Sequence, residues 1–160
     1  MGTTMTAAGI VDGNLVVAQV GDSRAYLLRE GVLTQVTHDQ SLVNQLIELG
    51  EITVEEARHF EYQNVILQAL GVQTDVDVQL STVPLRRGDR LIVCSDGLSG
   101  VVEDEELAVI LGTADDMDKA CQLLIERARS GGGPDNITVV AARFDGESLP
   151  PPTAADQVTY

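Results

Sequence analysis

The chain has 160 residues and 44% of them are hydrophobic, which favours one globular domain with an apolar core. Its formal net charge of -15 argues against nucleic-acid binding, because a surface that follows phosphates must be basic. No signal peptide and no apolar run of membrane-spanning length is apparent, so we expect no membrane association. The two cysteines lack metal-ligand spacing, so reduced thiols and a cytoplasmic location are expected.

Residues 3–36 have the alternating pattern of a β-meander. Asp12-Gly13-Asn14 and Glu30-Gly31 are typical of tight hairpin turns, and each separates two strand-like segments. The strands predicted in this region are 4–11, 15–20, 24–30 and 32–37.

Further along the chain, helices and strands alternate. Ser41 is a candidate N-cap for a helix over 42–49, and Thr53 with Glu56 forms a capping-box pattern for a second helix that ends near His59. The other predicted elements are strands over 64–70, 76–83, 91–95 and 136–144 and helices over 103–111 and 114–129. Residues 146–160 are polar and Pro-rich, which predicts a flexible tail after a domain over 1–145.

This order of elements predicts a layered α+β fold, in which two antiparallel sheets stack face to face and helices lie outside. Three aspartates stand where such strands begin or end. Asp22 and Asp96 each follow a predicted strand, and Asp135 precedes the last one. Taken singly, each is explained by turn formation, since Asp side chains bond nearby backbone groups.

Carboxylates brought together at neighbouring strand ends repel one another unless a proton or a cation lies between them. Oxygen ligands without paired Cys or His favour Mg²⁺ or Mn²⁺ over Zn²⁺. The three aspartates therefore form a candidate metal site.

Several segments resemble, in order and spacing, the motifs of bacterial type 2C (PPM) protein phosphatases, and the resemblance extends over nearly all of residues 1–145. Its most specific part is CSDGL followed by GGGPDNITVV. The matching segments are MGTT at 1–4, VGDSRAYLLREGVLTQVTHDQS at 20–41, ALG at 69–71, GDRLIVCSDGL at 88–98 and GGGPDNITVV at 131–140.

The resemblance implies a four-layer α/β/β/α sandwich, incomplete at its N-terminus, with a two-metal site at one end. Such phosphatases use Mn²⁺ or Mg²⁺ to activate a water that attacks the phosphorus of phosphoserine or phosphothreonine in proteins. It further implies that Asp96 and Asp135 bind a core metal and that Asp22 binds a third metal together with Asp96. Asp39 is a lesser candidate for that outer site, and residues 44–64 correspond to a mobile flap.

The upstream part of this family pattern, which carries an Asp-Gly-Met-Gly-Gly-like loop, a second acidic ligand and a phosphate-binding arginine, has no counterpart in the sequence. We therefore expect the chain alone to be an inactive or weak phosphatase. Two alternatives stay open: a catalytically silent binding or regulatory module, and a site completed by another chain. The expected partners are phosphorylated Ser/Thr proteins and a cognate kinase, and exposed sheet edges predict self-association.

Overall fold

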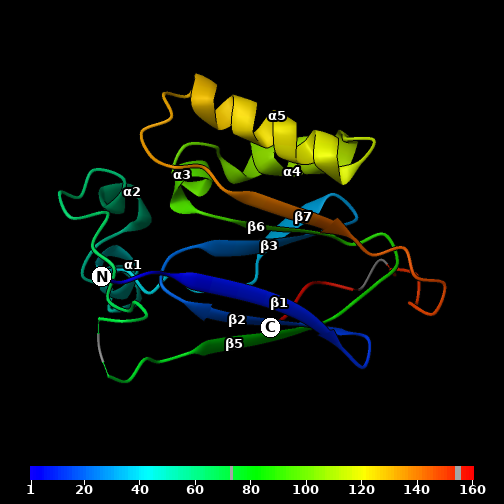
Figure 1. Cartoon of the computed structure of the whole chain (residues 1–160), viewed down its shortest axis with the longest axis horizontal. Coiled ribbons are helices and arrows are strands. Elements are labelled where there is room, and N and C mark those ends of the chain that lie inside the picture. The colour runs from blue at the N-terminus through cyan, green and yellow to red at the C-terminus, as the bar shows by residue number, and fades with distance from the viewer. Residues whose placement is uncertain (73, 154–155) are drawn as a thin grey trace.

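Two antiparallel β-sheets stacked face to face form the body of the computed structural model, which describes residues 1–72, 74–153 and 156–160 (Figure 1). The first sheet has the strand order β1-β2-β5, with β1 at Met5–Val11, β2 at Asn14–Val20 and β5 at Gln79–Pro84. The second has the order β4-β3-β6-β7, with β4 at Val32–Gln35, β3 at Arg24–Arg29, β6 at Arg90–Cys94 and β7 at Val139–Arg143.

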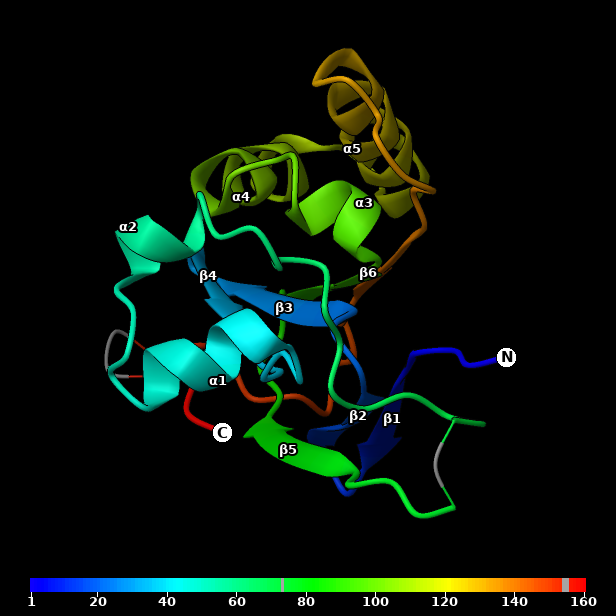
Figure 2. The same ribbon diagram turned by 90° about the vertical axis from the view of Figure 1, so that its left-hand side faces the viewer.

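The helices gather on one face and at one end of this sandwich. They are α1 at Leu42–Glu48, α2 at Val54–Ala57, α3 at Asp96–Ser99, α4 at Asp104–Thr113 and α5 at Met117–Ser130. The helices α4 and α5 cover the outer face of the four-stranded sheet, while α1 and α2 lie at the end of the sandwich that Figure 2 faces. Across the described residues, no helix combines the length and the apolarity needed to cross a membrane.

The central strand β3 is buried on both faces, because its pleat serves two separate cores. Ala25 and Leu27 point into the space between the sheets, whereas Tyr26 and Leu28 point toward the helices. All four side chains are buried. The four-stranded sheet is therefore the layer around which the rest of the molecule packs.

Local signals in the sequence predicted the turns and caps well. Asp12 and Gly13 have φ of 49° and 78°, the left-handed values that a tight two-residue hairpin requires. The Ser41 cap and the Thr53–Glu56 capping box are both present. The predicted strand over 64–70 was wrong: this segment makes only the isolated bridges Ile66–Ser41 and Leu70–Thr3.

The α+β fold of two antiparallel sheets with helices is confirmed. The described helices cover only the four-stranded sheet, so the outer face of the three-stranded sheet stays open. Met5, Val11 and Leu80 lie on that open face, and Leu80 is 69% exposed. Apolar side chains in a contiguous exposed region of a sheet mark a surface that another polypeptide can cover.

The two lateral sides of the sandwich also differ. Leu149 and Val158 from the tail pack against the core between the sheets, Leu149 beside the turn between β5 and β6, and Arg86 after β5 pairs with Asp156. On the β1 and β7 side, a groove of about 310 Å³ stays open between the sheets. Figure 2 shows the two chain ends on these opposite sides, C beside α1 and N beside β1. The structure shows that the tail contacts the domain. Its flexibility stays a prediction.

Candidate metal centre

Asp22 and Asp96 line the same cleft at one end of the sandwich. Asp22 lies in the short turn between β2 and β3, and Asp96 is the first residue of α3, separated from the end of β6 by Ser95 alone. The cleft has a volume of about 600 Å³ and lies between the helices α1 and α2 on one side and the start of α4 on the other. Two of the three predicted metal ligands are thus brought to one place.

Asp135 lies on the loop that adjoins Asp96, although it does not line this cleft. The Ser95 hydroxyl donates to the Asn136 carbonyl over 3.0 Å and accepts from the Thr138 N–H over 3.0 Å, which holds the two turns together. A Cβ on Gly97 would stand 2.3 Å from the Asn136 carbonyl oxygen, so only glycine allows this approach. Gly97 therefore has a structural role, since it lets the loop that carries Asp135 approach the start of α3.

Burial and neighbouring charges both act on the Asp22 carboxyl in this cleft. Burial raises the pKa of the Asp22 carboxyl, and the negative charge of Asp96 raises it further. Asp39 adds to this effect, while Arg24 opposes it. A cation bound between Asp22 and Asp96 would relieve the repulsion that raises this pKa.

Asp39, the lesser candidate ligand, forms an ion pair with Arg24. Its two oxygens accept from the Arg24 guanidinium, with a shortest N–O distance of 2.6 Å, and one of them also accepts from the Gln35 amide. A carboxylate held in this bidentate way has little capacity left for a metal ion. The pairing argues against Asp39 as a ligand, and the sequence could not reveal it because Arg24 and Asp39 lie on different segments.

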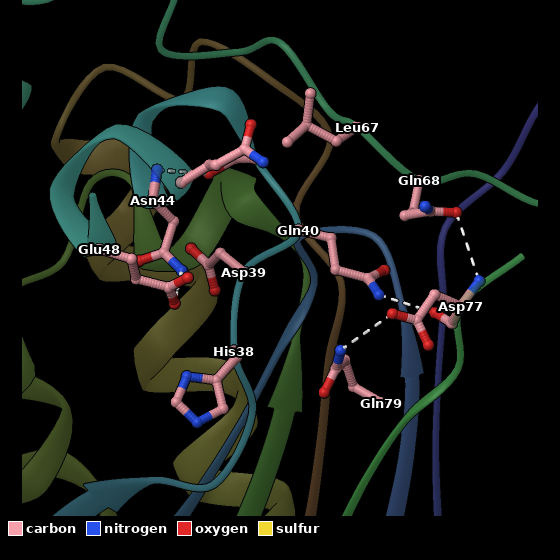
Figure 3. Close-up of a pocket in the computed structure, with 11 residues that line it drawn as sticks. His38, Asp39, Gln40, Asn44, Glu48, Leu67, Gln68, Asp77 and Gln79 are labelled. Atoms are coloured by element: carbon pink, nitrogen blue, oxygen red, sulfur yellow. Dashed lines mark hydrogen bonds between the residues drawn. The ribbon is translucent and has the colours of Figure 1, made fainter.

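A second hollow, of about 620 Å³, shares Asp39, Ser41 and Asn44 with the cleft. Figure 3 shows Asn44 and Glu48 of α1 on one of its walls and Gln40, Asp77 and Gln79 on another. Within the second wall, the side-chain amide of Gln40 donates a hydrogen bond to the Asp77 carbonyl over 2.7 Å. Among the described residues, no Lys or Arg lines this hollow.

The predicted flap, residues 44–64, contains most of α1 and all of α2 and forms one wall of the cleft. Arg58, at the end of α2, reaches across to Glu103 at the start of α4 with an N–O distance of 3.9 Å. Both side chains are well exposed, so this pair contributes little stability. Arg58 was missed in the sequence, where nothing distinguishes it from a solvated helix residue.

The side chains in this cleft are of the right kind to bind a divalent metal ion, but there are too few of them. Carboxylate oxygens suit Mn²⁺ and Mg²⁺. Within the ranges 1–72, 74–153 and 156–160, however, no group of three or more His, Cys, Asp or Glu side chains is arranged to hold a metal ion. Asp22 and Asp96 fit a divalent cation as two of its ligands, and the rest of the coordination shell would have to come from water or from outside the described chain.

A two-sheet sandwich with aspartates at its strand ends and a helical flap beside them defines a domain of the metal-dependent phosphatase class. The family profile described as protein phosphatase 2C matches residues 1–131, and the chain belongs to this family. The resemblance seen in the sequence is thereby confirmed.

Named relatives agree with this assignment. The chain is 43% identical over 145 residues to the serine/threonine phosphatase stp of Listeria monocytogenes, which covers 91% of this chain and 58% of the relative. It is 44% identical over 142 residues to the serine/threonine protein phosphatase PstP of Mycobacterium tuberculosis, covering 89% of this chain and 27% of the relative.

Solved structures show the same fold. The Mycobacterium tuberculosis phosphatase PstP/Ppp superposes with a TM-score of 0.86 at 42% identity, covering 91% of this chain and 61% of that one. The catalytic domain of PstP in complex with two manganese ions superposes with a TM-score of 0.79 at 43% identity, covering 91% and 60%. The chain thus spans less than two thirds of the length of these relatives.

Proposed function

We propose that this chain is the metal-binding part of a protein serine/threonine phosphatase that hydrolyses phosphoserine and phosphothreonine with Mn²⁺ or Mg²⁺. The observation that carries the proposal is the meeting of Asp22 and Asp96 in one cleft of a type 2C sandwich. A relative of this fold holds two manganese ions in its solved structure. Two core metals, and a third between Asp22 and Asp96, are the arrangement we propose for the complete site.

The chain's own residues divide the work of this site. Asp96 would hold a core metal together with Asp135, which lies on the loop that Gly97 allows to approach, and Asp22 would hold the third metal together with Asp96. When bound, the metal supplies an acidified water and neutralises charge on the phosphoryl oxygens. Arg58 faces the cleft from the flap, and its exposed pair with Glu103 leaves it free to attract an anionic substrate.

We also propose that this chain alone is inactive or weak. No group of three or more potential ligands converges in the part of the chain that the structure describes, so a pair of cations would have few protein ligands to hold it. If one of the two cations were lost, the nucleophilic water would lose one of its two activating metals. A site completed by another chain stays an open alternative.

The test is Mn²⁺ binding by calorimetry together with hydrolysis of a phosphothreonine peptide by the purified chain. We expect weak Mn²⁺ binding that Asp96→Ala reduces by about tenfold or more, since a direct ligand is lost. Asp118→Ala, an exposed acid on α5, is the matched control and should bind as the parent does. Turnover as fast as that of a complete type 2C enzyme would contradict the proposed inactivity.

A second candidate function is a catalytically silent phosphatase-like binding or regulatory module, which the shortage of converging carboxylates favours. A folded chain that ignores Mn²⁺ but binds a kinase or regulator would support this candidate against the first. For either function we propose a cytoplasmic location, phosphorylated Ser/Thr proteins or a cognate kinase as partners, and self-association through exposed sheet edges.

A further inference from the structure

Arg24 places a positive charge in the same cleft as the candidate metal ligands. It is the first residue of β3 and lines the cleft together with Asp22, Asp39 and Asp96. A guanidinium group repels a metal ion, so a role other than metal binding must account for it. Its contacts indicate that role, because the guanidinium donates to both carboxylate oxygens of Asp39 over 2.6, 2.9 and 3.0 Å.

Two neighbouring side chains hold this ion pair in place. Arg24 also donates to the hydroxyl of Tyr26 over 3.0 Å, and Tyr26 is fully buried. The side-chain amide of Gln35, at the end of β4, donates to Asp39 over 2.9 Å. The side chains of Arg24 and Asp39 are only 29% and 13% exposed, so water screens the pair in part. The pair is therefore more firmly held than an ordinary surface ion pair.

The backbone carries Asp39 to the turn that contains Asp22. The Gln40 N–H donates to the Gly21 carbonyl over 3.0 Å, and the Gly21 N–H donates to the side-chain oxygen of Gln40 over 2.7 Å. Asp22 and Asp39 are thus each next in sequence to one of two residues that are joined by two hydrogen bonds. Asp39 therefore lies beside the proposed third metal site, and the direction of its side chain decides whether it can take part.

Asp96 reaches the same region from β6. The strands β3 and β6 pair with Arg24 opposite Cys94, and this antiparallel register, continued by two positions, sets Asp22 opposite Asp96. The backbone thus brings three aspartates together, yet no group of three or more His, Cys, Asp or Glu side chains among the described residues is arranged to hold a metal ion. The pairing of Asp39 with Arg24 accounts for this difference.

We propose that Arg24 is a positioning residue that holds Asp39 out of the coordination shell of the third metal, which lies between Asp22 and Asp96. This inference rests on the proposed function, because it concerns a metal of the same site. The charge of the ligands is a main determinant of affinity for a divalent cation, so a site without Asp39 binds more weakly than one with it. Arg24 thereby keeps the third metal weakly held, and its own positive charge acts in the same direction.

A Mn²⁺ titration, in which electron paramagnetic resonance measures the free ion, tests this role without any turnover. Arg24→Gln should raise the affinity for Mn²⁺ by about tenfold, because it releases Asp39 and removes a repelling charge. The double variant Arg24→Gln with Asp39→Asn separates these two causes, and most of the gain should disappear in it. A gain that the double variant retained in full would overturn the proposal, because Asp39 would then not be the released ligand.

The matched control is Arg143→Gln, which removes the same charge from an exposed ion pair with Asp145. Arg143 lies opposite Arg90, at the end of the sheet away from the cleft, so Mn²⁺ binding should stay as in the parent chain. If circular dichroism shows that Arg24→Gln does not fold, Arg24→Lys takes its place. It keeps the charge but loses the bidentate contact, and it should give a smaller gain of about threefold. No gain in a folded Arg24 variant would overturn the proposal.

The failure of this inference and the failure of the proposed function give different results. The proposed function requires that the parent chain binds Mn²⁺ and that Asp96→Ala weakens the binding. Binding by Arg24→Gln but not by the parent would contradict the proposed third metal in this chain and support the role of Arg24. Binding by the parent that depends on Asp96, with no gain in Arg24→Gln, would support the proposed function and overturn the role of Arg24.

Discussion

One row of side chains crosses the three-stranded sheet and shows that its two edges differ in exposure to solvent. Ile10 of β1 pairs with Leu15 of β2, which pairs with Val83 of β5, so all three point toward the second sheet. Leu15 and Val83 are each 1% exposed, but Ile10 is 61% exposed. Residues of the same kind, on the same face and in the same row, therefore have opposite environments.

The cause is what lies beyond each edge. Beyond β5, the tail returns along the sandwich and places Leu149 and Val158 against the core between the sheets. Beyond β1, the described chain supplies no such cover, and the groove stays open. A strand's alternating pattern decides which way a side chain points, while its burial depends on a separate segment that closes the side.

The largest expected effect on the free energy of unfolding comes from removing the buried ion pair that joins the two sheets. Arg29 of β3 donates to both oxygens of Asp89 and to the Pro84 carbonyl of β5, so this buried pair joins the two sheets. Asp89→Ala leaves Arg29 buried without its counter-charge and should lower the free energy of unfolding by about 3–5 kcal/mol. Urea denaturation measures this change.

The exposed pair between Arg58 and Glu103 is the control for that experiment. Glu103→Ala should change the free energy of unfolding by less than about 1 kcal/mol, because exposed pairs contribute little. If Asp89→Ala were as mild as Glu103→Ala, the Arg29–Asp89 pair would not be what ties the sheets together.

An intermediate effect is expected from truncating the tail's apolar contacts. Leu149→Ala should lower the free energy of unfolding by about 1–2 kcal/mol, since the core contacts of a partly buried leucine are lost. It should also increase binding of an apolar dye, because the closed side would open. Ile10→Ala, on the open side, should cost less than about 0.5 kcal/mol in the monomer. Equal costs for the two variants would mean that the tail does not cover the core.

The smallest expected effect is a pH dependence of the contact that holds the tail against the domain. The hydrogen bonds from Arg86, and others from Thr153, lower the pKa of the Asp156 carboxyl well below its usual value. The contribution of this pair is therefore present above the ordinary Asp pKa and is lost as the pH falls through the lowered one. Hydrogen exchange of residues 156–160 should speed up at strongly acid pH relative to that of β3. Arg86→Gln should remove this dependence, and exchange that is independent of pH in both chains would contradict the prediction.

The sequence predicted most of the fold because the relevant signals are local. The hairpin at Asp12-Gly13 and the cap at Ser41 depend on residues within a few positions of one another. The segment 64–70 was predicted wrongly because its apolar residues resemble a strand, while its backbone finds only two isolated bridges. Hydrophobic pattern alone does not reveal whether a pairing partner is available.

The candidate site was predictable in part for the same reason. Asp22 and Asp96 belong to sequence motifs, and the strands that precede them deliver both to one cleft. The bidentate pairing of Asp39 with Arg24, and the position of Arg58 on the opposite wall, depend on contacts between distant segments. No spacing in the sequence encodes those contacts.

By itself, the sequence determined the family, most of the helices and strands in their order along the chain, and the aspartates that are candidate metal ligands, because motif and pattern are properties of neighbouring residues. Only the tertiary structure decided that Ile10 is exposed while Val83 is buried, and that Asp39 pairs with Arg24 and so has little capacity for a cation. The physical reason is that burial and ion pairing depend on which distant segments meet. In this chain, the tail meets one side of the sandwich and leaves the other open.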